Sequence, residues 1–149
     1  MKIVIQRVSH AEVKVNDEII GAINQGLLLL VGIDQSDSKE DADYLVNKIK
    51  NLRIFSDENG LMNLSLLQIE GEILCVSQFT LIAEYKKGNR PSFINAAKPP
   101  HAMPLFVYFQ SELKKTGLKI EGGEFGADMK VSLLNDGPVT IVMDSKTKA

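Results

Sequence analysis

The sequence is poor in the residues on which disulfide and metal chemistry depend. Its 149 residues include one cysteine, Cys75, and two histidines, His10 and His101. A single cysteine forms no intramolecular disulfide and suits a reducing cytosol, so we expect a cytoplasmic protein. Neither histidine belongs to a ligand spacing such as HExxH or lies beside the cysteine, which argues against zinc or another catalytic metal.

Nucleotide-phosphate motifs are absent as well. The chain has no GxxxxGK[ST] sequence, and the glycines at positions 122, 123 and 126 do not form a GxGxxG sequence after a strand. We therefore interpret residues 122–126 as a flexible turn and expect no cofactor.

The chain also lacks long apolar runs and an excess of positive charge. Its longest apolar run, residues 27–31, is far shorter than the roughly 20 residues that cross a bilayer. The N-terminal apolar run stops at Gln6 and Arg7, too early for a signal peptide, and we expect no membrane partner. With a formal charge of −2, contact with RNA needs a local basic patch.

What remains is the length and composition of one globular domain, residues 1–149. Hydrophobic periodicity predicts two helices, one after a capping box of Ser38 and Asp41 and one at roughly residues 103–115. A continuously apolar strand at residues 26–33 is expected to be covered on both faces. The other predicted strands are residues 2–8, 12–15, 18–23, 72–82, about 129–134 and 139–143. The prediction is an α+β fold with a mostly antiparallel, barrel-like sheet covered by two helices.

Three polar residues interrupt the strand predicted at residues 72–82, which is otherwise apolar on both faces. Ser77, Gln78 and Thr80 each need a hydrogen-bond partner or a pocket there. The hydroxyls of Ser77 and Thr80 are candidate nucleophiles, but no base lies near them in sequence and no GxSxG elbow is present. The alternative is a structural role, in which both hydroxyls satisfy buried backbone.

Two further segments are candidates for function. Residues 83–100 form a long irregular stretch whose cations, at positions 86, 87, 90 and 98, either belong to a solvated loop or contact phosphates at the rim of a pocket. Residues 135–138 (NDGP) are predicted to form a tight turn. About 5–6% of X–Pro bonds are cis, and the sequence alone does not decide the state of Gly137–Pro138.

Together these segments resemble the D-aminoacyl-tRNA deacylase family. The resemblance covers residue 1 to about residue 143 and is carried by IQRV at 5–8, SQFTL at 77–81, GNRPSF at 88–93 and NDGPVT at 135–140. It implies a homodimeric ester hydrolase that frees tRNA of D-amino acids, and of glycine attached to the alanine tRNA. A cis Gly137–Pro138 peptide of the partner chain would enter each active site, held in place by Arg7. Its Gly137 carbonyl would exclude L side chains by a clash.

The resemblance also implies where the reaction takes place. Backbone N–H groups around Phe79 and Thr80 would stabilise the oxyanion, and the terminal adenosine would supply a vicinal hydroxyl. Thr80 would orient the substrate rather than attack it, with Ser77 and Gln78 in the same catalytic segment. Phe79 and Phe125 would form walls that stack on the adenine. The other residues implied in binding or support are Lys86, Arg90 and Asn135.

Two other functions are compatible with the same residues. A tRNA-end binding module would use the same dimer cleft without turnover and would protect charged tRNA. A small-molecule esterase with Thr80 as covalent nucleophile would form a trappable acyl-enzyme and lose nearly all activity in Thr80→Ala.

Overall fold

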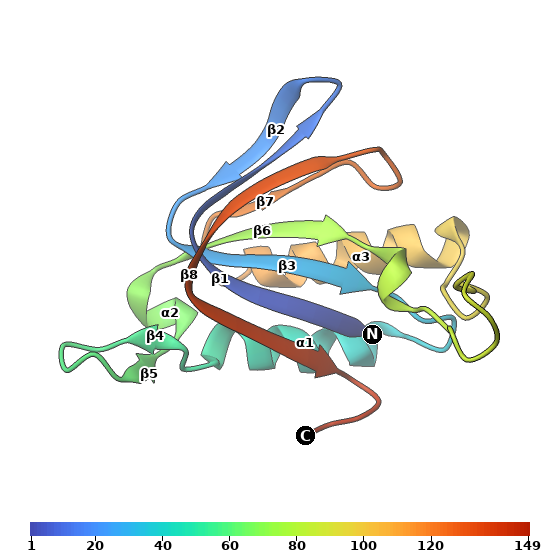
Figure 1. Ribbon diagram of the computed structural model, residues 1–149. Coiled ribbons are helices and arrows are strands. Elements are labelled where there is room, and N and C mark those ends of the chain that lie inside the picture. The colour runs from blue at the N-terminus through green and yellow to red at the C-terminus, as the bar shows by residue number, and fades with distance from the viewer.

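A six-stranded mixed sheet forms the centre of the computed structural model, which describes residues 1–149 (Figure 1). Its strands follow the order β2 (Glu18–Ile23), β1 (Lys2–Val15), β3 (Gly26–Gly32), β6 (Glu72–Ser77) and β7 (Ile120–Gly122), and β8 (Lys130–Asp144) pairs with β1. β1 is antiparallel to β2, β3 and β8, whereas β3, β6 and β7 run parallel to one another. The predicted mostly antiparallel sheet is confirmed.

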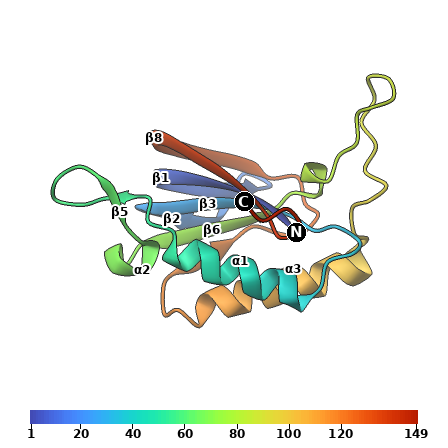
Figure 2. The same cartoon turned by 90° about the horizontal axis from the view of Figure 1, so that it is seen from below.

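Two long helices, α1 (Lys39–Asn51) and α3 (Pro99–Lys114), lie side by side on one face of the sheet (Figure 2). Successive strand residues point to opposite faces, so β3 and β6 contribute to two cores. The larger core lies under the helices and includes Leu27, Leu29, Val31, Ile73 and Cys75. The smaller core lies on the other face and consists of Val8, Ala11, Val13, Ile23, Leu28, Leu74 and Val76. The α+β class with two covering helices is therefore confirmed.

The smaller core is enclosed because the sheet curls until β2 and β7 meet. A Cβ atom on Gly21 of β2 would stand only 2.6 Å from the carbonyl oxygen of Gly122 on β7. Glycine permits this close approach of two backbones. The sheet thus forms the nearly closed, barrel-like core that we predicted.

Four short elements were not predicted. β4 (Phe55–Ser56) and β5 (Met62–Leu64) form a hairpin, α2 (Leu66–Ile69) precedes β6, and β7 follows α3. None of them exceeds four residues. Segments this short show no measurable hydrophobic period, and the one local signal among them is the capping box of Ser65 and Gln68 at the start of α2.

Two predicted strand breaks are wrong. Residues 2–8 and 12–15 belong to the single strand β1, because β8 pairs with both parts. Residues 129–134 and 139–143 likewise fall almost entirely within the single strand β8. Both halves of β8 run antiparallel to β1, so the chain does not reverse between them and residues 135–138 form no tight turn.

Two predicted element ends also differ from the structure. β6 ends at Ser77 and a 3₁₀ turn (Phe79–Leu81) follows, so the strand does not reach Ile82. α3 begins at Pro99 rather than Met103. Two prolines at its start need no N–H donor there, and Pro104 lies inside the helix rather than in its first turn.

The start of α1 is held as predicted and is tied to both ends of the chain. Asp41 accepts a hydrogen bond from the backbone N–H of Ser38 at 2.9 Å and another from the Ser145 hydroxyl at 2.6 Å. The buried Met1 ammonium lies 2.6 Å from Asp37 Oδ1 and donates to Ser145 at 2.8 Å.

No helix in the structure has the length and apolar character to span a bilayer.

Candidate active site

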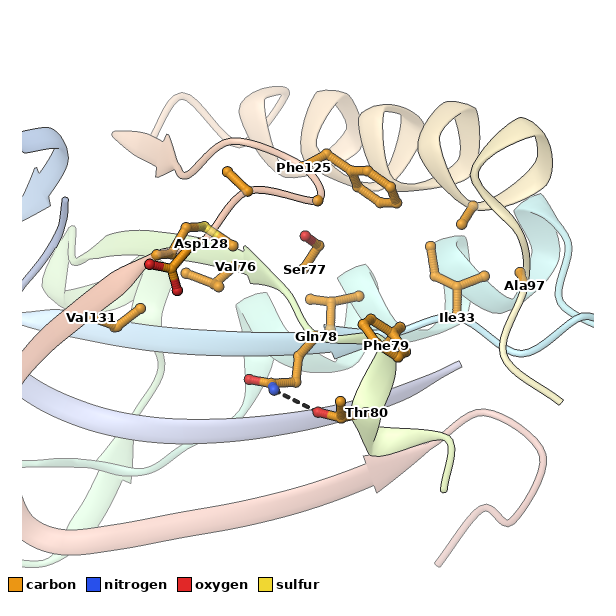
Figure 3. A pocket seen from close by; sticks show the side chains of 15 residues that line it. Ile33, Val76, Ser77, Gln78, Phe79, Thr80, Ala97, Phe125, Asp128 and Val131 are labelled. Carbon is orange, nitrogen blue, oxygen red and sulfur yellow. Dashed lines mark hydrogen bonds between the residues drawn. The ribbon is translucent and has the colours of Figure 1, made fainter. Parts of the chain in front are cut away.

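A cavity of about 260 Å³ opens where the parallel strands β3 and β6 end (Figure 3). Crevices at the carboxyl ends of parallel strands are common ligand sites. The lining comes from these strand ends, the 3₁₀ turn, the start of α3 and the segment after β7. Its apolar members are mainly Val31, Ile33, Val76, Ala97, Ala102, Met129 and Val131. A mostly apolar lining with a few convergent polar groups is typical of small-molecule sites.

The backbone leaves the sheet at the floor of this cavity. Gln78 N–H still donates to the Val31 carbonyl at 2.8 Å, which continues the parallel pairing by one residue. The turn that follows is closed by Leu81 N–H to the Gln78 carbonyl and by Ile82 N–H to the Phe79 carbonyl. Because a 3₁₀ turn does not use its first N–H groups, those of Phe79 and Thr80 are left for another acceptor.

The polar side chains of the turn hold one another in fixed directions. Gln78 Nε2 donates to Thr80 Oγ1 at 2.6 Å, drawn as the dashed line in Figure 3. Since that hydroxyl oxygen already accepts a hydrogen bond, its own O–H is available to donate to a ligand. The Ser77 hydroxyl faces the cavity opposite Phe125 and has no hydrogen-bond partner within the chain.

Two aromatic rings stand on different sides of the cavity. Phe125 lies on the side of α3, where it packs against Phe106 with ring centroids 5.9 Å apart. Phe79 belongs to the 3₁₀ turn, is 59% exposed, and contacts Phe93 edge to face at 5.2 Å. A planar group entering the cavity therefore meets aromatic surface from two elements.

The cavity contains no histidine or lysine to activate a side-chain nucleophile, and its one carboxylate, that of Asp128, is paired with Lys130 Nζ at 3.0 Å. Asp128 is the only charged residue in its lining, and neither His10 nor His101 contributes to it. Cys75 is buried on the helix side, where burial raises the pKa of its thiol far above the usual value. No group of three or more His, Cys, Asp and Glu side chains is placed to hold a metal.

The Gly137–Pro138 peptide bond is cis and lies in an exposed bulge of β8. Gln6 pairs with Thr140 and Val8 pairs with Asn135, so four residues, 136–139, stand opposite the single residue Arg7. Arg7 Nε donates to the Asp136 carbonyl at 2.9 Å, and Arg7 Nη1 donates to the Ile54 carbonyl at 2.7 Å. Arg7 thus joins the backbone of the bulge to the residue before β4.

Within one chain, the bulge and the cavity lie near opposite ends of β3. Ser77 is paired with Val31 near one end of β3, whereas Arg7 is paired with Leu27 near the other. Four residues of strand separate these two positions, or about 13 Å. Neither Gly137 nor Pro138 lines the cavity.

The structure therefore brings only some of the predicted site residues together. Ser77, Gln78, Phe79, Thr80 and Phe125 share the cavity. The other predicted residues lie outside it: Arg7, Asn135, Gly137 and Pro138 at the bulge, and Lys86 and Arg90 in the loop after the 3₁₀ turn. Gly126 and the alanines Ala97, Ala102 and Ala127 were not predicted, because small apolar residues carry no chemical signal of a site, and Asp128 and Met129 were not predicted either.

Comparison with known sequences gives full-length matches. Over residues 4–144 the chain matches the family described as D-Tyr-tRNA(Tyr) deacylase. A D-aminoacyl-tRNA deacylase of Bacteroides fragilis (strain YCH46) is 58% identical over 149 residues, which is 99% of each chain. One of Geobacillus sp. (strain WCH70) is 52% identical over 149 residues, covering 100% of this chain and 98% of the relative.

Two solved structures share the fold. The c-Myc DNA unwinding element binding protein matches with a TM-score of 0.91 and 44% identity, covering 97% of this chain and 98% of the other. A probable eukaryotic D-amino acid tRNA deacylase matches with a TM-score of 0.81 at 17% identity, covering 95% and 97%. The second likeness concerns the fold alone.

Proposed function

The chain belongs to the D-Tyr-tRNA(Tyr) deacylase family, and we propose that the Gly137–Pro138 bulge of a partner subunit selects its substrates. Like its relatives, the protein is a D-aminoacyl-tRNA deacylase, a hydrolase of ester bonds. It releases the D-amino acid from tRNA and so corrects mischarged tRNA in translation.

The proposed assembly is a homodimer in which each bulge enters the other subunit's cavity. Within one chain the bulge is about 13 Å along the sheet from Ser77 and does not line the chain's own cavity. β8 pairs only with β1, so its other edge is free, and its Leu134 and Val142 are 52% and 64% exposed. A long edge strand with exposed apolar residues favours pairing with another chain. In a twofold-symmetric dimer the free edge of β8 in one subunit would pack against the same edge in the other, and each bulge would complete the partner's site.

Selection is proposed to occur by exclusion. The Gly137 carbonyl of the partner would occupy the volume that the side chain of an L-aminoacyl ester requires, whereas a D side chain points elsewhere. Glycine has no side chain to clash, so glycyl-tRNA would also be hydrolysed, including glycine attached to the alanine tRNA. Exclusion by a clash requires that the Gly137 carbonyl be held in position to within about 0.5 Å. The buried Arg7, bonded to two backbone carbonyls, supplies that rigidity.

The proposed chemistry uses backbone and substrate rather than a side-chain nucleophile. The free N–H groups of Phe79 and Thr80 would donate to the developing oxyanion, a contribution of roughly 10²- to 10³-fold per donor in rate. Thr80, held by Gln78, would orient the ester through its O–H group, and Ser77 would contact substrate in the same segment. Water would attack the ester, which is already activated and lies beside the vicinal hydroxyl of the terminal adenosine.

Binding of the tRNA is proposed to be limited to its acceptor end. Phe79 and Phe125 would stack on the terminal adenine, and Lys86 and Arg90 would contact phosphates without reading sequence. Asn135, which precedes the bulge, would support it. The free thiol of Cys75 and a tRNA substrate both fit a cytoplasmic location.

The observation that carries the proposal is the placement of an exposed, Arg7-held bulge away from the chain's own cavity. The test is to incubate the protein with D-tyrosyl-tRNA, L-tyrosyl-tRNA and glycyl-tRNA and to measure release of the amino acid. Catalysed release from the D and glycyl esters, with the L ester left at its uncatalysed rate, is expected. Equal decay of the D and L esters would contradict the selection, and protection of all three would indicate a binding module.

A further inference from the structure

An arm formed by residues 84–92 projects from the body of the molecule beside the cavity (yellow-green in Figure 2). The backbones of Glu84 and Ser92 exchange two hydrogen bonds of 2.8 Å, which makes the arm a short antiparallel pair. Its base is fixed by Asn95, whose Nδ2 donates to Glu84 Oε1 at 2.9 Å and whose carbonyl accepts from Gln35 N–H. The arm therefore leaves the molecule in a defined direction.

The tip of the arm carries positive charge that nothing in the chain neutralises. Lys86, Lys87 and Arg90 are exposed and form no ion pair or side-chain hydrogen bond. The nearest carboxylate in sequence, that of Glu84, is engaged by Asn95. In a chain of net charge −2, three free cations within five residues form a local site for an anionic ligand.

Aromatic rings connect this tip to the cavity. Tyr85 is 78% exposed and next to the cations. Tyr85 follows Glu84 and Phe93 follows Ser92, so the two aromatic residues are the next in the chain after each half of the Glu84–Ser92 bridge. Phe93 in turn contacts Phe79 at the cavity wall. Aromatic residues thus stand at the cavity wall, at the base of the arm and beside its cations.

We propose that this arm binds the unpaired 3′ strand of the tRNA just before its terminal adenosine. Tyr85 stacks on a base of that strand, and Lys86, Lys87 and Arg90 contact its phosphates. The inference rests on the proposed function, which places the terminal adenosine in the cavity. Cations that follow the backbone, combined with aromatic rings under the bases, are how proteins hold single strands without reading their sequence. The arm also explains how an acidic chain binds tRNA.

Two sets of variants test the arm with D-tyrosyl-tRNA as substrate. Tyr85→Ala is expected to lower kcat/KM by about 5- to 150-fold, the loss that removing one stacking ring produces, whereas Tyr85→Phe retains the wild-type value. Lys86→Ala combined with Lys87→Ala is expected to reduce the slope of log kcat/KM against log salt by about 1.4, or about 0.7 for each phosphate that a lysine no longer neutralises. Lys114→Ala is the control, because Lys114 is exposed and lies about 18 Å along α3 from Ala102.

An unchanged kcat/KM in Tyr85→Ala together with an unchanged salt slope in the double variant overturns the inference. A wild-type protein that releases no amino acid contradicts the proposed function instead. The arm is then tested by fluorescence anisotropy with a labelled RNA hairpin that ends in an unpaired CCA. The same variants weaken binding if the arm contacts RNA, and bind like wild type if it does not.

Discussion

Arg7 on β1 donates a hydrogen bond from Nε to the carbonyl oxygen of Asp136 on β8, at 2.9 Å and across 129 positions of sequence. The same buried guanidinium donates from Nη1 to the Ile54 carbonyl at 2.7 Å. One planar group therefore fixes both the bulge that contains Gly137 and the base of the β4–β5 hairpin. The proposed selection depends on Arg7, because Arg7 fixes the position of the bulge.

Replacing Arg7 by lysine is expected to weaken both stability and selection. A lysine ammonium does not reproduce the planar fork that reaches two carbonyls. The free energy of unfolding should fall by about 1–3 kcal/mol, because a buried carbonyl is left unsatisfied. Urea denaturation measures this loss. The ratio of kcat/KM for D-tyrosyl-tRNA to that for L-tyrosyl-tRNA, here called the D/L ratio, should fall as well.

Arg53→Lys is the matched control for that change. Arg53 also donates from Nε to a backbone carbonyl, that of Asn63 at 2.8 Å, but it is exposed. Its replacement should leave both the free energy of unfolding and the D/L ratio nearly unchanged. A loss of stability in Arg7→Lys with an unaltered D/L ratio would show that Arg7 has no part in selection.

Gly137→Ala is expected to displace the bulge and let L esters react. The φ angle of Gly137 is +133°, and a Cβ atom there would lie 2.9 Å from Val139 Cγ2 and 3.2 Å from Arg7 Nη2. The backbone conformation alone costs about 1–3 kcal/mol for a residue with a side chain. Release of tyrosine from L-tyrosyl-tRNA measures the loss of selection.

Gly60→Ala separates backbone strain from displacement of the bulge. Gly60 has a φ of +78°, and no atom lies within 4 Å of the position of its Cβ. The alanine should cost stability at this site too, yet leave the D/L ratio at the wild-type value. A similar fall of the ratio in both variants would count against a specific role of Gly137.

The parts of this site that the sequence predicts are those determined by local chemistry. Ser38 and Asp41 are only three residues apart, so their capping interaction needs no tertiary information. Ser77, Gln78 and Thr80 were identified because polar groups in an apolar strand need a partner or a pocket. The end of β6 was not predicted, because Phe79, Leu81 and Ile82 continue the apolar pattern of the strand.

The missed features depend on contacts between distant segments. The 3₁₀ turn folds over Gly32 of β3, where a Cβ atom would stand 2.8 Å from the Cβ of Leu81. The bulge at residues 136–139 exists because β8 changes register on β1 opposite Arg7. Neither contact shows in the residues on either side of it, so the apolar pattern predicted a strand in the first case and the NDGP sequence predicted a turn in the second.

Thr80→Val is expected to lower kcat by roughly tenfold, the effect of losing one orienting hydrogen bond of about 1.4 kcal/mol. Valine keeps the shape of threonine and removes only the hydroxyl that Gln78 fixes. Mass spectrometry of the quenched wild-type reaction should show no acylated protein. Near-total loss of activity together with a trapped acyl-enzyme would identify Thr80 as a covalent nucleophile.

Stability should fall in acid partly through Asp41. Burial alone would raise the pKa of its carboxyl, but hydrogen bonds from Ser145, Ser38 and Lys146 outweigh burial and hold the pKa well below its usual 3.8. A carboxyl with a lowered pKa in the folded state stabilises the protein above pH 3.8, and that contribution is lost as pH falls further.

Asp41→Asn should therefore lower the free energy of unfolding at pH 7, and its difference from wild type should shrink as the pH falls below 3.8. Urea denaturation between pH 7 and pH 2 measures this. Asp17→Asn is the control, because Asp17 is exposed and makes no side-chain hydrogen bond or ion pair. A difference between Asp41→Asn and wild type that stays constant over this range would contradict the assignment.

The most direct test of selection across the dimer uses subunits that carry different substitutions. One subunit carries Gly137→Ala, and the other carries Ala127→Trp, which fills its own cavity. In the heterodimer, isolated with two affinity tags, the only open cavity belongs to the Gly137→Ala subunit and faces the wild-type bulge of its partner. We predict a wild-type D/L ratio for this heterodimer. A ratio as low as that of the Gly137→Ala homodimer would contradict the account.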